Sequence, residues 1–243
     1  MGGAIGRHRR WHGLWPLAVG LVTGWTLLFL ALGSEAEQAA GDADPPEARL
    51  SVDARARAAA MRVETRGCGQ MGGGTAVATT EGILTNRHVV EGASRLVVAG
   101  SSVIGRALAP GMDAALLESP AQWSAQALTL ADELPVEGEM VTVAGYPAGG
   151  GLVVVTGSVL SHSDQSWWGE GSGPLLIVDV QVSPGWSGGP VLDGEGQLVG
   201  IVRGTETSTG VTLVEPSVAL LEWMGSDPQV EAVSAAVARC EPG

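Results

Sequence analysis

A serine enclosed by glycines is the feature of this sequence with the clearest chemical meaning. Ser187 lies in SPGWSGGPVLD, residues 183–193, between Gly185 and the pair Gly188 and Gly189. A nucleophilic serine needs a tight, exposed turn on which backbone N–H groups converge where an oxyanion forms, and glycines permit such a turn. The alternative is a glycine-rich β-turn that contains a serine by chance. The pattern favours nucleophilic catalysis by Ser187.

A serine hydroxyl is a poor nucleophile at neutral pH, so a general base should come from elsewhere in the chain. His88 lies in GILTNRHVVEG, at the end of an apolar run. His8 and His12 precede a long apolar segment, and His162 follows a strand-like run without a recognisable setting. His88 is therefore the candidate base, and the alternative is a core histidine whose ring nitrogens are satisfied by hydrogen bonds.

The third group should be an acid that fixes the imidazole tautomer and stabilises the imidazolium. Asp113, in APGMDAALLES, stands 25 residues after His88 and before Ser187. Three other aspartates fall in the same interval: Asp132 and Asp164 among loop-like polar residues, and Asp179 inside the apolar run PLLIVDVQV. Asp113 is the predicted acid.

The elements that must position these residues are short strands. From Met61 onward, some ten apolar runs are separated by turn residues, a spacing typical of an all-β sandwich or barrel. They are MRVETR, GTAVATT, GILTNRHVV, RLVVAG, SSVIGRAL, MVTVAGYP, GLVVVTGSVL, PLLIVDVQV, GQLVGIVRG and GVTLVEP. Pro216–Met224 then changes to a helical pattern, with Val218, Leu221 and Trp223 placed to face a core.

These motifs together resemble the trypsin-like serine proteases of the Deg/HtrA type, over about residues 61–225. The string GxSGGP resembles the active-site serine motif, TxxHVV the segment of the general base, and D-x-A-x-L the segment of the acid. The chain order His, Asp, Ser also differs from the orders of subtilisin and the α/β-hydrolases. The resemblance implies an all-β fold of two six-stranded antiparallel barrels with a C-terminal helix.

The same resemblance implies roles for residues around the triad, without a metal or an organic cofactor. The N–H groups of Gly185 and Ser187 would form the oxyanion hole. The strand GQLVGIVRG would bind extended protein or peptide substrates by backbone pairing. The implied substrate-binding residues are Val202, Arg203 and Gly204 on that strand, and Gln181 and Val182 before the serine loop.

This sequence departs from the family's pattern in three places. Trp186 stands where related proteins usually carry Asp or Asn, which affects support of the oxyanion loop. Arg203 stands where a small residue is usual, and it would either favour acidic substrate groups or turn into solvent. The sequence also lacks the PDZ domain that many Deg/HtrA proteins use for peptide recognition. The alternative to an enzyme is a catalytically silent trypsin-like fold that acts as a membrane-bound binding or sensing module.

The N-terminal region predicts a membrane anchor. Residues 14–33 are twenty uncharged residues behind Arg7, Arg9 and Arg10, which places residues 1–13 in the cytoplasm and the protease domain outside. A cleaved signal peptide, which would make the protein secreted, is the alternative. Residues 34–60 have the composition of a linker or stalk, with good helix propensity over 47–60. Residues 61–243 form the predicted protease domain.

Charge and cysteines limit the remaining possibilities. The net charge is −13, and all 13 basic residues are arginine, so the acidic surface argues against nucleic acid as a partner. The two cysteines, Cys68 and Cys240, predict a disulfide in an exported protein, and two buried thiols are the alternative. The anchor and these two cysteines resemble membrane-tethered periplasmic acid-resistance proteases, in which such cysteines are bonded. The sequence leaves the oligomeric state open.

Overall fold

The computed structural model describes residues 51–67, 70–118, 127–148, 150–163 and 174–233. These residues belong to one compact unit, which begins at Leu50. The predicted anchor, residues 14–33, lies outside the described residues. Among the helices that are described, none is both long and apolar enough to cross a bilayer.

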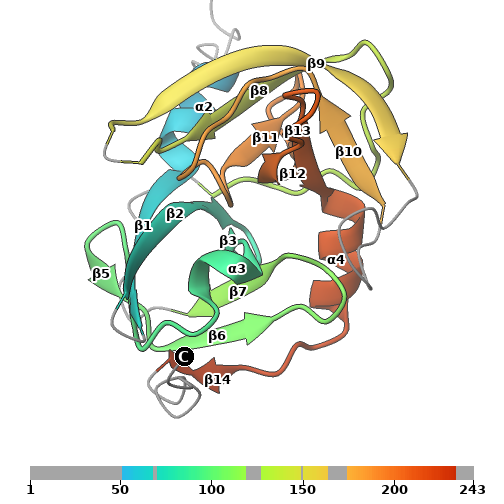
Figure 1. Cartoon of the computed structure of the whole chain (residues 1–243). Helices are drawn as coiled ribbons and strands as arrows, with labels where there is room; N and C mark the ends of the chain where they lie inside the picture. The colour runs from blue at the N-terminus through green and yellow to red at the C-terminus, as the bar shows by residue number, and fades with distance from the viewer. Residues whose placement is uncertain (1–50, 68–69, 119–126, 149, 164–173, 234–243) are drawn as a thin grey trace, which may run out of the picture. The chain divides into compact units, whose positions relative to one another are not determined.

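The first described element is the helix α2, Val52–Ala59, in which the side chain of Ser51 accepts a hydrogen bond from the N–H of Ala54 at 3.2 Å. Ala56 and Ala59 on this helix are completely buried. The helix runs directly into β1 and packs beside β8 and β11 (Figure 1). The structure therefore assigns this part of the predicted spacer to the folded unit, because its two alanines face the core.

The N-terminal half is an antiparallel sheet of eight strands rather than the expected six. Its order is β14-β6-β7-β3-β2-β1-β4-β5, and the described residues show no pairing between its two outer strands. The two-residue strands β5 and β14 extend the sheet beyond six. The strands are β1 Ala60–Gly67, β2 Gln70–Thr79, β3 Gly82–Thr85, β4 Arg95–Val98, β5 Ser101–Ser102, β6 Gly105–Leu108, β7 Ala115–Glu118 and β14 Glu231–Ala232.

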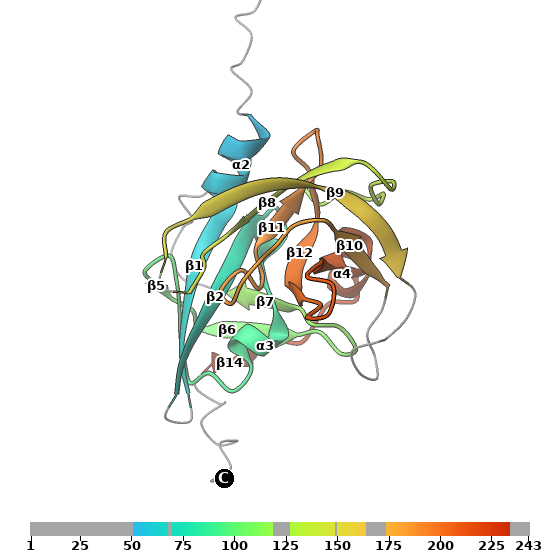
Figure 2. The same ribbon diagram turned by 45° about the horizontal axis from the view of Figure 1, so that its top comes forward.

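The C-terminal half is a closed barrel of six strands in the order β10-β13-β12-β11-β8-β9, as expected (Figure 2). All its neighbouring strands pair antiparallel. The strands are β8 Met140–Gly145, β9 Val153–Ser163, β10 Leu175–Val178, β11 Pro190–Leu192, β12 Leu198–Thr205 and β13 Thr212–Pro216. Valine dominates the barrel interior, in agreement with a chain that has one Phe and one Tyr.

The helix α4, Ser217–Gly225, follows the last barrel strand, one residue later than the predicted Pro216–Met224. Leu220 and Trp223 are its buried apolar residues, whereas Val218 and Leu221 are only half-buried. Trp223 and Leu221 lie against the core as expected, whereas Leu220 rather than Val218 is the other residue of this helix that packs there. That core contains side chains of both halves, among them Val77, Leu84 and Leu192.

Candidate active site

His88 and Asp113 come together on the N-terminal half. His88 lies on the short helix α3, Arg87–Val90, directly after β3, and Asp113 lies in the turn between β6 and β7. The Nδ1 atom of His88 is 2.6 Å from Oδ2 of Asp113, and the backbone N–H of His88 donates to Oδ1 at 3.0 Å. Because an ionised carboxylate only accepts hydrogen bonds, it holds the proton on Nδ1 and leaves Nε2 as the basic nitrogen.

Asn86 holds the main chain of Asp113 in place. The sequence analysis did not identify this residue. Its side chain is fully buried, and Nδ2 donates to the carbonyl oxygen of Asp113 at 2.7 Å. Since Asn86 stands two residues before His88, it ties the turn of Asp113 to the start of α3. The only sequence feature that could have pointed to Asn86 was its place in the TNRHVV segment, two residues before His88.

The Ser187 loop connects β10 to β11 in the barrel half. Gly188 has φ of +83°, and a Cβ atom there would stand 2.1 Å from the carbonyl oxygen of Thr75. Gly185 has φ of +100°, and a Cβ there would stand 2.3 Å from the carbonyl oxygen of Tyr146. Only glycine fits these two positions, so the sequence motif is explained by backbone conformation and close approach.

Thr75 on β2 connects the Ser187 loop to the other half of the molecule. Its hydroxyl donates to the carbonyl oxygen of Gly185 at 2.8 Å and accepts from the N–H of Tyr146 at 2.9 Å. Its own N–H donates to the carbonyl oxygen of Ser187 at 2.8 Å. Within the described residues no acceptor is recorded for the N–H of Gly185 or of Ser187, so both remain available to an oxyanion. Nothing in the sequence singled out Thr75.

Trp186 supports the same loop from the barrel interior. It is 4% exposed, and a Cβ atom at Gly145 would stand 2.6 Å from its ring. The N–H of Trp186 donates to the carbonyl oxygen of Ser183 at 3.2 Å, and its own carbonyl oxygen accepts from Gly189 at 2.8 Å. A large buried side chain therefore supports the Ser187 loop at this position.

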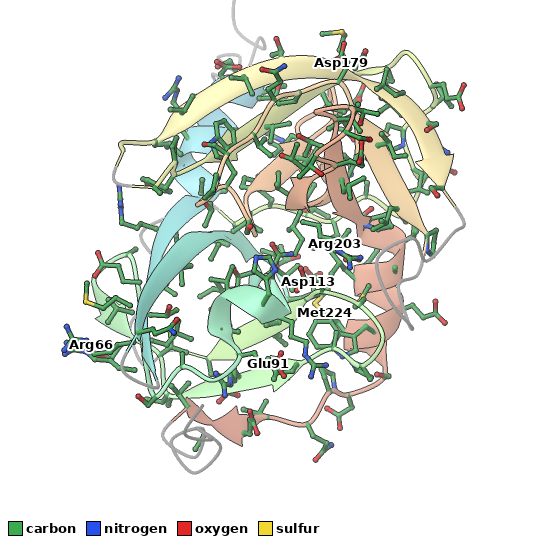
Figure 3. All side chains as sticks on the ribbon, in the orientation of Figure 1. Arg66, Glu91, Asp113, Asp179, Arg203 and Met224 are labelled. Carbon is green, nitrogen blue, oxygen red and sulfur yellow. The ribbon has the colours of Figure 1, made fainter. Side chains whose placement is uncertain are left out.

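Arg203 turns inward behind the aspartate. Its side chain is 17% exposed, and Nη1 lies 3.2 Å from Oε1 of Glu215, a residue on β13 that is completely buried. The same Oε1 accepts the backbone N–H of Asp113 at 3.3 Å. Arg203 and Asp113 lie close together where the two halves meet (Figure 3). The side chain of Arg203 therefore does not turn into solvent, and its expected role in substrate recognition stays a prediction.

The acids Asp113 and Glu215 differ in proton affinity. Burial raises the pKa of the Asp113 carboxyl, but hydrogen bonds from the ring and backbone of His88, with its charge and that of Arg203, lower it more, so the pKa lies below its usual value. Burial raises the pKa of Glu215, and the charge of Arg203 offsets only part of that increase. Asp113 is therefore ionised at neutral pH beside His88.

The hydroxyl of Ser187 is directed at the barrel rather than at the imidazole. Its Oγ donates to the carbonyl oxygen of Arg203 at 3.4 Å, and the described structure records no hydrogen bond between Oγ and His88. Catalytic hydrogen bonds are often long without substrate and tighten in the reacting complex. The structure thus joins His88 and Asp113, the candidate base and acid, directly, and holds Ser187, the candidate nucleophile, on a separate loop.

The expected substrate-binding residues do not form one surface. Val202 is completely buried, and its N–H and C=O pair with Gly189 and Gly188, so none of its groups is left to pair with a peptide. At Gly204, by contrast, a Cβ atom would meet nothing within 4 Å, so this part of β12 is open.

The segment before the serine loop lies opposite the end of β12. Val182 accepts a hydrogen bond from the hydroxyl of Thr205 at 3.2 Å, and Gln181 is exposed. The end of β12 thus lies beside the segment that leads into the Ser187 loop, and the substrate-binding roles of these residues stay predictions.

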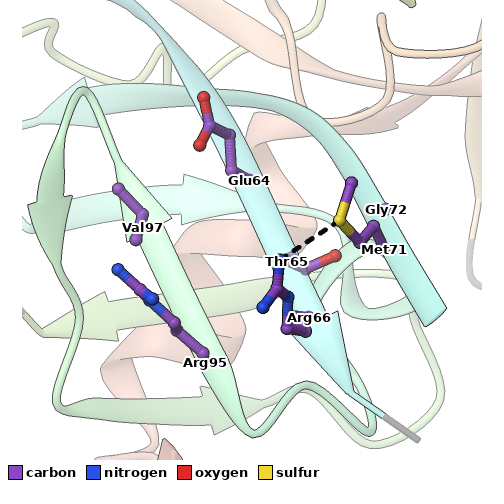
Figure 4. Close-up of a pocket in the computed structure, with 7 residues that line it drawn as sticks. All are labelled: Glu64, Thr65, Arg66, Met71, Gly72, Arg95 and Val97. Atoms are coloured by element: carbon purple, nitrogen blue, oxygen red, sulfur yellow. Dashed lines mark hydrogen bonds between the residues drawn. The ribbon is translucent and has the colours of Figure 1, made fainter. Parts of the chain in front are cut away.

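A groove of about 380 Å³ adjoins the imidazole. His88, Val89 and Glu91 line one side, and the start of β2, residues 70–73, lines another. A second depression of about 290 Å³ is lined by Arg66, Arg95 and residues of β1 and β2 but by none of His88, Asp113 and Ser187 (Figure 4). Of these two hollows, only the first is lined by His88.

The competing candidates from the sequence lie elsewhere. His162 is on β9, where Nε2 is 2.9 Å from the carbonyl oxygen of Pro135. Asp179 is exposed just after β10. Cys68, Cys240 and Asp164 lie outside the described residues. Within the described ranges, no three His, Cys, Asp or Glu side chains gather as metal ligands would.

Comparison with known proteins agrees with this fold. Residues 72–201 match the family model of the trypsin-like peptidase domain, and the chain belongs to that family. It is 33% identical over 129 residues to the chloroplastic protease Do-like 2 of Arabidopsis thaliana, covering 49% of this chain and 21% of the relative. It is 33% identical over 150 residues to a probable periplasmic serine endoprotease, DegP-like, of Hahella chejuensis, covering 57% and 30%. The chain thus spans less than a third of the length of these relatives.

Solved structures give the same result. The active form of the Rv3671c protease from M. tuberculosis superposes with a TM-score of 0.66 at 22% identity, covering 75% of this chain and 86% of that one. The HtrA-type protease AlgW with a tripeptide has a TM-score of 0.64 at 28% identity, covering 72% and 62%. The predicted resemblance to serine proteases of the Deg/HtrA type is confirmed.

Proposed function

We propose that this protein is a serine endopeptidase that hydrolyses protein or peptide substrates through an acyl-enzyme intermediate. The observation that supports this most directly is the 2.6 Å contact between His88 and Asp113, beside a glycine loop that carries Ser187 and two available N–H groups. The curated relatives are named as serine proteases of the same type. No cofactor takes part in the proposed reaction.

In the proposed mechanism, Ser187 Oγ gives up its hydrogen bond to the carbonyl oxygen of Arg203 and attacks the carbon of the scissile carbonyl group. His88 Nε2 takes the hydroxyl proton and returns it to the leaving amine, while Asp113 stabilises the imidazolium. The N–H groups of Gly185 and Ser187 bind the oxyanion, and a water molecule then releases the acyl group by the same steps in reverse.

The second candidate is a silent trypsin-like fold that acts as a membrane-bound binding or sensing module. It is favoured by one observation, the hydrogen bond of Ser187 to Arg203 in place of one to His88. In that case the loop would keep its present conformation when a peptide binds.

Labelling by a fluorophosphonate probe separates the two candidates. The full chain in detergent should gain one adduct by intact mass, and Ser187→Ala and His88→Ala should gain none. Ser183→Ala and His162→Ala are the matched controls, because Ser183 is exposed in the same loop and His162 lies on β9. A folded wild-type protein without an adduct would contradict the peptidase and favour the binding module.

The proposed location is the outer side of a membrane, with residues 14–33 as a single-pass anchor and residues 61–243 outside. The charge pattern around that segment supports this orientation. Alkaline extraction of membranes should leave the full chain in the pellet. Release of a shortened chain into the soluble fraction would instead indicate a cleaved signal peptide.

We also propose a disulfide between Cys68 and Cys240. In the entropic model, closing so long a loop stabilises the folded state by up to about 5 kcal/mol. Unfolded protein should take up iodoacetamide at both cysteines after reduction and at neither before it. Two additions without reductant would contradict the bond.

A further inference from the structure

The ion pair of Arg203 and Glu215 has no role in the reaction described above, yet it contacts the catalytic acid directly. Glu215 is completely buried, and one of its oxygens, Oε2, has no hydrogen-bond partner in the described structure. The other oxygen, Oε1, receives both Arg203 Nη1 and the backbone N–H of Asp113. The pair is thus attached to the loop that carries Asp113.

Stability alone is a weak explanation for such a pair. Removing two charges from water costs several kcal/mol for each ion, and their attraction repays this only when the remaining lone pairs are also satisfied. Here one carboxylate oxygen remains unsatisfied, so apolar side chains of similar volume would serve packing as well. The position of the pair points instead to what its charges do next to Asp113.

A role in binding acidic substrate groups also fits poorly. The side chain of Arg203 is 17% exposed and is bound to a buried carboxylate. The part of Arg203 that faces the nucleophile is its carbonyl oxygen, 3.4 Å from Ser187 Oγ. The guanidinium of Arg203 therefore lies near Asp113 and Glu215 rather than near Ser187.

We propose that Arg203 and Glu215 are positioning residues that form a charge-balanced brace, which orients Asp113 and sets the proton affinity of the His88–Asp113 dyad. This inference rests on the proposed peptidase function. In the brace, Glu215 fixes the guanidinium beside Asp113 and also holds the main chain of Asp113. The negative charge of Glu215 balances the positive charge of Arg203. The pair therefore changes the proton affinity of the His88 imidazole little, and the charge of Asp113 dominates.

Other charges near the dyad come from α3. Arg87 and Glu91 both interact with Asp113 through space, but they pair with each other at 2.8 Å on the exposed side of the helix. They are unchanged in the variants below, so their contribution is the same in each.

The test is the pH profile of inactivation of the full chain by a fluorophosphonate, a readout that needs no knowledge of the substrate. Glu215→Gln leaves the cation of Arg203 uncompensated, which disfavours the imidazolium and should move the acid limb to lower pH by about one unit. The double variant Arg203→Met with Glu215→Gln removes both charges and should return the limb to the wild-type position. Arg203→Lys with Glu215→Gln keeps a cation and should remain shifted.

The possible results distinguish failure of the brace from failure of the proposed peptidase function. If the wild type reacts and the acid limb is the same in all variants, or is shifted equally in the Met and Lys double variants, the brace is overturned and the peptidase stands. If the wild type does not react at all, the proposed function itself fails. Should Glu215→Gln fail to fold in a thermal scan, Arg203→Gln serves instead: loss of the cation alone must move the limb to higher pH, and an unchanged limb overturns the proposal.

Discussion

The two halves of the site are held in place by different forces. On the N-terminal half, His88 and Asp113 are fixed by hydrogen bonds between polar and ionisable groups, with Asn86 behind them. On the barrel half, the Ser187 loop is fixed by main-chain hydrogen bonds and by the buried ring of Trp186. We therefore expect the geometry of the His88–Asp113 pair to depend on protonation and the geometry of the Ser187 loop to depend on packing.

The sharpest test of this division is whether the two halves act as one catalytic unit. Ser187→Ala and His88→Ala should each lower the rate of hydrolysis of an unfolded protein substrate by at least about 10⁴-fold. The double variant should lose no more, because the serine and the base act in the same step. Steady-state assays of the three variants check this. A double variant whose loss is the product of the two single losses would mean that the halves act independently.

The packing side of the comparison predicts a large effect at Trp186. Trp186→Ala should lower the free energy of unfolding by about 3–5 kcal/mol and reduce kcat by about 10²-fold, since the cavity releases the loop that carries the oxyanion donors. Trp223→Ala on α4 is the matched control, as it removes another buried indole far along the chain from that loop. It should lower stability to a similar degree with kcat nearly unchanged. Equal losses of kcat would show that Trp186 acts only through global stability.

Thr75 joins the halves, so its hydroxyl should matter to both stability and rate. Thr75→Val leaves the N–H of Tyr146 and the C=O of Gly185 without a partner and should cost about 1–3 kcal/mol of stability. We expect a fall in kcat of about tenfold with KM little changed, because a lost interaction worth about 1.4 kcal/mol in the transition state is a tenfold effect. Thr75→Ser keeps both hydrogen bonds and should retain most activity. Similar kinetics for the two variants would exclude a role for the hydroxyl.

The smallest predicted effect is on the pH dependence of stability, and it is tested with one aspartate from each half of the molecule. The pKa of Asp113 is lowered in the folded state, so its ionisation adds stability above the unfolded pKa of about 3.9, and that stability is lost as pH falls through the folded pKa. Burial raises the pKa of Asp193, between β11 and β12, beyond what its backbone hydrogen bonds offset, so its ionisation removes stability as pH rises.

Denaturant unfolding of Asp113→Asn and Asp193→Asn between pH 3 and 7 checks these signs. Relative to wild type, Asp113→Asn should gain less stability as pH rises, and Asp193→Asn should gain more. The same change of slope in both variants would contradict the assigned directions.

The sequence alone was enough to propose which residue types could carry chemistry and in what order. Ser187 among glycines, His88 after an apolar strand and Asp113 before the next strand could be proposed because a reactive turn and short strands have local signatures, and the structure places His88 and Asp113 in contact. The periodicities predicted short strands and the terminal helix α4, while the closed barrel was implied only by the resemblance to the trypsin-like proteases. The open eight-stranded sheet did not, since its outer strands are only two residues long.

Only the tertiary structure decided how the site is supported. The bond of Thr75 to Gly185 joins residues 110 positions apart, and that of Asp113 to Glu215 joins residues 102 apart. No local pattern encodes such contacts, because they form only when the two halves pack against each other. For the same reason the inward turn of Arg203 and the burial of Val202 could not be predicted: a strand's pattern shows which residues alternate, while the neighbouring strands determine which of its groups remain exposed.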